Sequence, residues 1–252
     1  MIRLQQVFTD KYANRVAVGN NHLLLVMYRL AYPIALLLHR LRLTPDQITT
    51  LSLLSAIMAF AALVLHAPAA WFCFFWGLTA LFDVCDGTVA RMSSRIATRA
   101  FRYDHMSDIF KMSLVVVGVA IRFDESCLWV LCSTFLFVLL YSEIVSHDLK
   151  YALERAKGVA ETPVHAEAEA HAAPRLRERI PAIHFLVTRL PFVYILLQQL
   201  YVATTTFNGH TLLVFLAFPF GGAWTYGALL YLTVLALHSC VSGILSLWRM
   251  RR

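Results

Sequence analysis

The sequence predicts an all-α integral membrane protein with six transmembrane helices and an N-terminal amphipathic helix that lies in the membrane interface. Apolar residues make up 59% of the 252 residues, and the mean hydropathy is +0.64. This composition leaves too little polar surface to cover a water-soluble globule of this size. Several apolar stretches are also long enough to cross a membrane, since a helix needs about 20 residues to do so.

Each predicted span is a long apolar run bounded by polar or turn-forming residues. Residues 23–41 are apolar too, but Pro33 and three basic residues interrupt them, which better suits a helix lying in the interface than a seventh span. Pro and Gly residues in 218–227 predict a turn or a broken helix before the last span. The six predicted spans lie at roughly 48–66, 70–89, 104–122, 127–147, 183–206 and 224–248.

Basic residues gather on one side of this predicted topology. With both termini inside, only Arg122 falls in an outer loop, and the other outer connections, 66–69 and 207–223, carry no Lys or Arg. Because Lys and Arg flanking short loops stay on the cytoplasmic side, both termini are predicted to be cytoplasmic. The net charge of +7 then reflects topology and attraction to anionic lipids, and nucleic-acid binding is not needed to explain it.

The whole chain, 1–252, is predicted to form a single membrane domain. Residues 1–42 form its N-terminal cytoplasmic and interfacial segment, and 150–180, rich in Ala, Glu and Arg, form a cytoplasmic loop. Acidic and histidine residues in 165–171 alternate at a period of two, unlike a helical metal site, which favours a solvated loop. The five cysteines form no metal-type pair and mostly lie in apolar runs, so they are interpreted as inert packing residues.

Four aspartates interrupt the apolar pattern around the second and third predicted spans. Asp83 and Asp86 are three residues apart, and Asp104 and Asp108 are four apart, so each pair lies on one side of a helix. The short basic connection 92–103 predicts that the two helices are antiparallel neighbours with facing pairs near the cytoplasmic surface. Because an intramembrane carboxylate costs about 2.5–3.5 kcal/mol, unpaired acids at all four positions would be expensive.

Converging carboxylates are typical of sites for hard cations. Two divalent ions would neutralise four carboxylates and leave coordination positions for a substrate, and oxygen ligands favour Mg²⁺ or Mn²⁺ over zinc. Paired ions of this kind commonly hold a phosphate undergoing in-line displacement. Gly87 has no side chain, so a phosphate or base can approach the backbone there, and Ala90 adds only a methyl group. Arg91 offers a forked donor to a phosphate. A pyrophosphate substrate is therefore predicted.

An ion or proton transporter is the alternative interpretation, because transporters also keep acidic residues inside their spans. It accounts less well for the adjoining Gly-x-x-Ala-Arg sequence and for the basic connection.

The motif built on these residues resembles the signature of the CDP-alcohol phosphotransferases (CDP-alcohol phosphatidyltransferases), D-x-x-D-G-x-x-A-R-x(8)-G-x-x-x-D-x-x-x-D. Seven of its eight fixed positions match between Asp83 and Asp108. Upstream, the stretch LTPDQIT at 43–49 resembles the TPNQIT-type sequence that opens the first span of this family. The resemblance is close over about 25–150 and rests on hydropathy elsewhere.

The resemblance implies an enzyme of phospholipid or related lipid synthesis. A CDP-linked alcohol, typically CDP-diacylglycerol, would give its phosphoryl-alcohol part to an acceptor hydroxyl and release CMP. Asp83, Asp86 and Asp104 would be ligands of two divalent cations, and Asp108 would be both a metal ligand and the general base that takes the acceptor's proton. The family usually forms homodimers, and the short single-domain chain suggests a bacterial inner membrane with the site facing the cytoplasm.

The same resemblance places Gly87, Ala90 and Arg91 beside the CDP moiety. Ala100 stands where the family has its second glycine, so a methyl group is added near the nucleotide, and nucleotide fit is expected to be altered. Lys111, one turn after Ser107, is expected to reach an acceptor or lipid phosphate, with a snorkelling lysine as the plainer interpretation. A catalytically inactive member that binds the CDP-alcohol without turnover is a further alternative.

The acceptor is not identified by the sequence. Residues 143–146, EIVS, loosely resemble the R-E-x-x-V-S segment of phosphatidylglycerophosphate synthases, but Ser142 stands at the arginine position. This departure weakens the case for a phosphorylated acceptor. Glycerol phosphate, inositol phosphate, serine, amino alcohols and sugar-bearing lipids all stay open.

Overall fold

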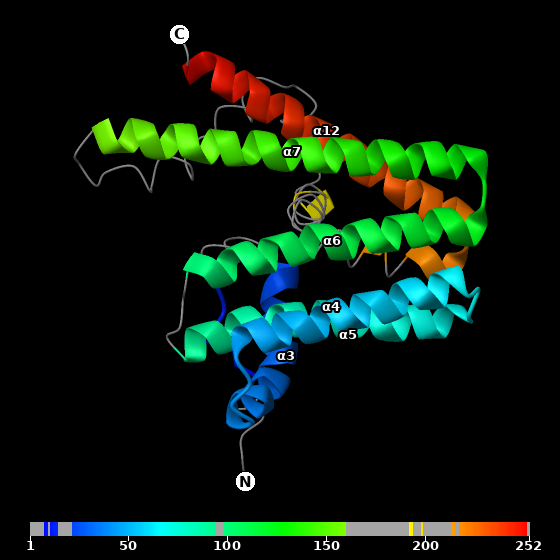
Figure 1. The fold of residues 1–252 in the computed structure, drawn as a ribbon, viewed down its shortest axis with the longest axis horizontal. Coiled ribbons are helices and arrows are strands. Elements are labelled where there is room, and N and C mark those ends of the chain that lie inside the picture. Colours follow the sequence, from blue (N-terminus) through cyan, green and yellow to red (C-terminus); the bar gives the residue numbers. More distant parts are fainter. Residues whose placement is uncertain are drawn as a thin grey trace.

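The computed structural model describes residues 8–9, 11–14, 22–93, 98–159, 192–193, 198, 213–214 and 217–250. Within these residues every regular element is a helix, and the fold is shown in Figure 1. The elements are α3 (His22–Arg40), α4 (Pro45–Val64), α5 (Ala69–Met92), α6 (Thr98–Phe123), α7 (Ser126–Val159), the 3₁₀ helix η1 (Phe218–Phe220) and α12 (Gly222–Met250).

Four helices of the described part are long and apolar enough to cross a membrane, namely α4, α5, α7 and α12. They correspond to the predicted spans 48–66, 70–89, 127–147 and 224–248. The segment 104–122 is also helical, but the polar residues of α6 keep it out of this group. Residues 183–206 lie outside the described part except for 192–193 and 198. The all-helical prediction is confirmed, whereas the count of six spans is not.

The helix predicted at 23–41 forms as α3, and its position in the membrane interface stays a prediction. The break predicted within 218–227 is confirmed, because η1 ends at Gly221, whose φ of 98° is left-handed, before α12 begins. A glycine suits this turn because it lacks the side chain that makes such a backbone costly.

The start of α4 follows directly from its sequence. The Thr44 hydroxyl accepts a hydrogen bond from the Gln47 backbone N–H at 3.3 Å, and the Gln47 side chain accepts one from the Thr44 N–H at 2.9 Å. This reciprocal arrangement is a capping box, and Pro45 occupies the first turn, where its missing N–H costs nothing. The stretch LTPDQIT therefore fixes where α4 begins.

α4 packs against both α5 and α6, whereas α5 and α6 share few backbone contacts among the described residues. The prediction that the two aspartate-bearing helices are direct neighbours is therefore only partly right, because α4 lies against each of them. Its buried positions are mostly small, which allows this double contact; the small ones are Thr49, Ser52, Ser55, Ala56, Ala59 and Ala62. On α6, a Cβ added at Gly118 would lie 2.8 Å from Leu63 Cδ1, so these two helices approach closely there.

The largest hydrophobic cluster joins α4–α7, η1 and α12. Phe72 of α5 contacts Phe218 of η1 with ring centroids 4.4 Å apart, and α7 packs along α12. A second cluster joins α3 to α5 through Ala31, Ala35 and Val89. These contacts hold the carboxyl end of α5 and the amino end of α6 in the fixed positions that the site requires.

Candidate active site

Three of the four aspartates come together. Asp83 of α5 and Asp104 and Asp108 of α6 each offer one carboxylate oxygen, and these oxygens all lie within 4.8 Å of one another. The i, i+4 spacing places Asp104 and Asp108 on one side of α6, as the sequence predicts. Carboxylates from two helices therefore meet, although they are distant in the chain.

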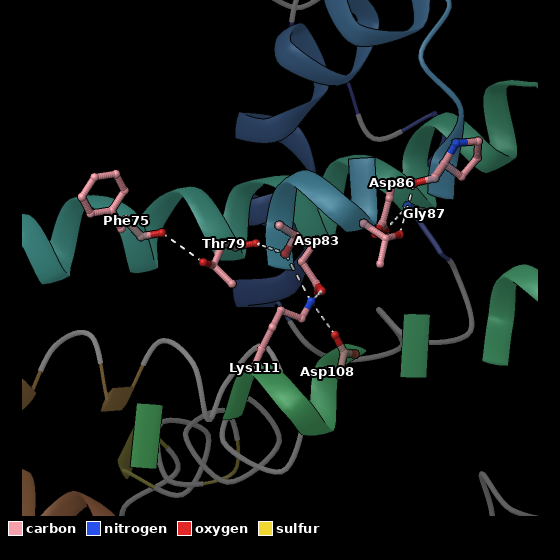
Figure 2. A network of polar contacts seen from close by, with 10 residues as sticks. Phe75, Thr79, Asp83, Asp86, Gly87, Asp108 and Lys111 are labelled. Atoms are coloured by element: carbon pink, nitrogen blue, oxygen red, sulfur yellow. Dashed lines mark hydrogen bonds and ion pairs between the residues drawn. The ribbon is translucent and has the colours of Figure 1, made fainter. Parts of the chain in front are cut away.

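Lys111 lies within this group (Figure 2). Its Nζ is 2.6 Å from Asp83 Oδ1 and 2.6 Å from Asp108 Oδ1, and its side chain is fully buried. Nζ also donates a hydrogen bond to Ser52 Oγ of α4 at 3.2 Å. The plainer interpretation of a snorkelling lysine is therefore wrong, because the ammonium group lies inside the helix bundle. A contact with substrate phosphate stays a prediction.

α4 supplies two hydroxyl groups that form hydrogen bonds with residues of the site, one to Lys111 and one to Asp86. Ser52 Oγ receives the Lys111 hydrogen bond and donates its own to the Thr79 carbonyl at 2.9 Å. One turn earlier, Thr49 Oγ1 donates to Asp86 Oδ2 at 2.7 Å. Both are buried and three residues apart, so they lie on the same face of α4.

Asp86 lies beside the group formed by the other three aspartates. It is 4% exposed, and its carboxylate accepts hydrogen bonds from Thr49 and from the Gly87 backbone N–H. It is not part of the group whose oxygens lie within 4.8 Å of one another. The predicted convergence of all four carboxylates is therefore seen for three, and a role of Asp86 as a metal ligand stays a prediction.

Arg91 folds back along α5 beside Gly87. A Cβ added at Gly87 would lie 3.3 Å from an Arg91 guanidinium nitrogen, so the glycine leaves space for this group. The guanidinium donates from Nε to the Tyr12 carbonyl and lies 5.2 Å from the centroid of the Tyr28 ring. Burial raises the pKa of the Tyr28 phenol above its usual value, and the positive charge of Arg91 opposes this rise. The phenol is therefore neutral at neutral pH.

Two other predicted substrate contacts are less well defined. Ala90 is partly exposed near the carboxyl end of α5. Ala100 lies in the first turn of α6, but its side chain is outside the described part of the structure.

The donor set fits a divalent cation that prefers oxygen ligands. Asp104 Oδ1 is buried and has no hydrogen-bond partner among the described residues, so this carboxylate oxygen is available to coordinate a cation. Three carboxylates within reach of one cation match the chemistry of Mg²⁺ or Mn²⁺. A single ammonium group, on Lys111, faces these three acids in the described contacts.

The family-model comparison agrees with this donor set. Residues 42–249 match the model of the CDP-alcohol phosphatidyltransferases. The chain belongs to this family. No individual curated protein matches it. The family comprises transferases of substituted phosphate groups, which move a phosphoryl-alcohol group from a CDP-alcohol. The resemblance stated from the sequence is thereby confirmed.

One further polar contact joins α6 to α7 next to the aspartates. His105 Nε2 of α6 is 3.1 Å from Glu143 Oε2 of α7, and both side chains are substantially exposed. Ser142, at the position where an arginine would suit a phosphorylated acceptor, is buried and donates to the Leu139 carbonyl at 2.9 Å. Ser142 therefore makes its hydrogen bond within its own helix.

Sequence reasoning missed the roles of Thr49, Ser52 and Tyr28. Thr49 and Ser52 could have been found, because two hydroxyl residues three apart in an otherwise apolar span indicate a polar helix face. Tyr28 gave no comparable signal, since its contact with Arg91 depends on how α3 packs on α5.

Proposed function

We propose that the protein transfers a phosphoryl-alcohol group, such as a phosphatidyl group, from a CDP-alcohol to an acceptor hydroxyl. The observation that carries this proposal is the meeting of Asp83, Asp104 and Asp108 within 4.8 Å inside the family's own motif. Three carboxylates this close, with one ammonium group beside two of them, are suited to binding a divalent cation.

In this proposal Asp83, Asp86 and Asp104 hold the cations, with Asp108 as a further ligand. Two divalent ions, Mg²⁺ or Mn²⁺, would neutralise the pyrophosphate oxygens of the donor and polarise the phosphorus that is attacked. Asp86 is fixed by Thr49 and by the Gly87 N–H, so its carboxylate has a defined orientation before any ligand arrives. Such preorganisation lowers the cost of binding charge at the moment of reaction.

Asp108 is the proposed general base. It takes the proton of the acceptor hydroxyl as that oxygen forms a bond to the alcohol-bearing phosphorus of the donor. The bond from this phosphorus to the bridging oxygen breaks, and CMP leaves with that oxygen and its electron pair. A base beside the held phosphate is required because an alcohol is a weak nucleophile until its proton is removed.

The nucleotide is proposed to lie beside Gly87, Ala90, Arg91 and Ala100. Arg91 is already oriented by Tyr12 and Tyr28, which keeps its forked donor close to the carboxyl end of α5. We further propose that residues 1–252 form one membrane domain and that it works as a homodimer. The site would face the cytoplasm of a bacterial inner membrane, with both termini on that side.

CMP release tests the proposed function. Purified protein is given CDP-diacylglycerol and either Mg²⁺ or Mn²⁺, and a panel of acceptor alcohols is added one at a time. CMP that appears only with metal, donor and one acceptor class supports the proposal and names the acceptor. CDP-alcohol binding without CMP for any acceptor would identify an inactive binding protein, and metal-coupled ion flux without nucleotide binding would favour a transporter.

A further inference from the structure

We propose that Lys111 is a resident counter-ion of the aspartate group: it holds Asp83 and Asp108 together in the metal-free protein and competes with divalent cations for them. The first half of this proposal stands on the ion pairs alone. The second half rests on the proposed function, because it assumes that these aspartates bind a divalent cation.

Lys111 is closely surrounded by oxygen atoms of three residues. Nζ donates hydrogen bonds to Asp83 Oδ1 at 2.6 Å and to Ser52 Oγ at 3.2 Å, and it forms an ion pair with Asp108 Oδ1 at 2.6 Å. A phosphate would have to compete with these partners for the ammonium group. The geometry therefore suits a bridge between two helices better than a contact with substrate.

The ion pairs of Lys111 reduce the repulsion between Asp83 and Asp108 in the metal-free protein. Asp83 and Asp108 expose only 12% and 19% of their side chains, and Lys111 exposes none. Two such carboxylates facing each other without a cation would repel strongly, because water screens them poorly. Lys111 lies on the same helix as Asp108 and reaches across to α5, so it joins the two sides of the site before metal arrives.

The same geometry makes Lys111 a competitor of the metal. The oxygens that contact Nζ belong to two of the three residues able to surround one cation. A divalent ion must either displace the ammonium group from these oxygens or bind the remaining ones beside a fixed positive charge. Both routes weaken metal binding relative to the same carboxylates without Lys111.

The test removes the charge and keeps the shape. Lys111→Met retains a long unbranched side chain, and both proteins are purified with Mn²⁺ and then compared in EDTA and in Mn²⁺. We expect the Tm of Lys111→Met in EDTA to fall by about 5 °C or more. We expect its Kd for Mn²⁺, measured by the EPR signal of free Mn²⁺, to decrease by about fivefold or more. Ser52→Ala is the matched control, since it removes a neighbouring contact and keeps the charge; its Kd should change by less than about twofold.

Equal or weaker Mn²⁺ binding by Lys111→Met would overturn the competition, and an unchanged Tm in EDTA would overturn the bridging role. If Lys111→Met does not fold in EDTA, the double variant Lys111→Met/Asp83→Asn decides, because it removes the ammonium group together with one of its two acidic partners. The double variant should be more stable in EDTA than Lys111→Met alone, and a lack of such rescue would contradict the bridge.

The two proposals fail in different ways. The rescue in EDTA involves no metal and no substrate, so it tests the bridge even if the protein releases no CMP. Failure of wild-type protein to bind Mn²⁺ would count against the proposed function and against the competition, and the rescue would still decide the role of Lys111 in the metal-free site.

Discussion

The two halves of α6 differ sharply in what the same helix face carries. In the first half that face presents Asp104, Asp108 and Lys111, whereas in the second half it presents Val115 and Val119, which are fully buried. These five positions follow one another at intervals of four, three, four and four residues, so they form one continuous stripe. The apolar half therefore fixes the rotation of α6, and the polar half uses that rotation to aim its carboxylates at α5.

This difference indicates that the position of the aspartates depends on apolar packing in the other half of the helix. The apolar half packs on α4, and Gly118 lets the two helices approach at Leu63. The polar half makes its contacts through ion pairs and hydrogen bonds to Asp83 and Ser52. Changes in the polar half should alter chemistry, metal binding and, at Lys111, the stability of the metal-free protein. Changes in the apolar half should alter stability.

The largest effect is expected from Asp108→Asn in the polar half. The carboxamide keeps the size of the side chain but cannot take the acceptor's proton, so CMP release should fall by about 10²–10⁴-fold. Binding of the CDP-alcohol, measured by titration in Mg²⁺, should stay within about threefold of wild type because the other ligands remain. Turnover at the wild-type rate would rule out Asp108 as the base.

Asp83→Asn should act on binding itself. A neutral amide replaces one of the carboxylates that would surround the cation, so metal-dependent binding of the CDP-alcohol should weaken by about tenfold or more. The measurement is a titration of the CDP-alcohol at several Mg²⁺ concentrations. If the Mg²⁺ dependence is the same as in wild type, Asp83 is not a metal ligand.

Gly118→Ala should weaken the apolar half without touching a ligand. The added Cβ would lie 2.8 Å from Leu63 Cδ1, and such overpacking costs about 1–3 kcal/mol of unfolding free energy. Gly227→Ala in α12 is the matched control, because a Cβ there meets nothing within 4 Å. Thermal unfolding of the two variants gives the comparison; an equal shift in both would contradict the close approach of α4 and α6.

His105→Gln should have the smallest effect. The pair with Glu143 is largely solvent-exposed, and exposed pairs contribute about 0.2–1 kcal/mol. CMP release should therefore change by less than about twofold, as measured with the best acceptor from the panel. A tenfold loss would instead place His105 at the acceptor.

The helices and the aspartate spacing could be predicted from the sequence because both depend on local periodicity. The start of α4 at Thr44 follows from its capping residues, and the pairing of Asp104 with Asp108 follows from their spacing of four. The break near Gly221 follows from turn chemistry in the same way.

The contacts between side chains of the site could not be predicted, because they depend on which helices pack together, and no single segment of the sequence specifies that. The short connection after Met92 suggested that α5 and α6 pack directly, but the small residues of α4 let that helix pack against both. The hydrogen bond from Thr49 to Asp86 likewise joins α4 to α5 and could not be predicted from either segment alone. Lys111 was expected to face a phosphate, because a lone basic residue near a motif gives no sign of a buried partner on another helix.

The small buried side chains of α4 set the distance between the helices that form the candidate site. Its buried surface is mostly serine, threonine and alanine, so α5 and α6 can both pack closely against it. Engineering aimed at metal preference or at bulkier nucleotides could therefore start with α4. Exchanging an alanine there for a larger residue would widen the gap while every ligand kept its identity.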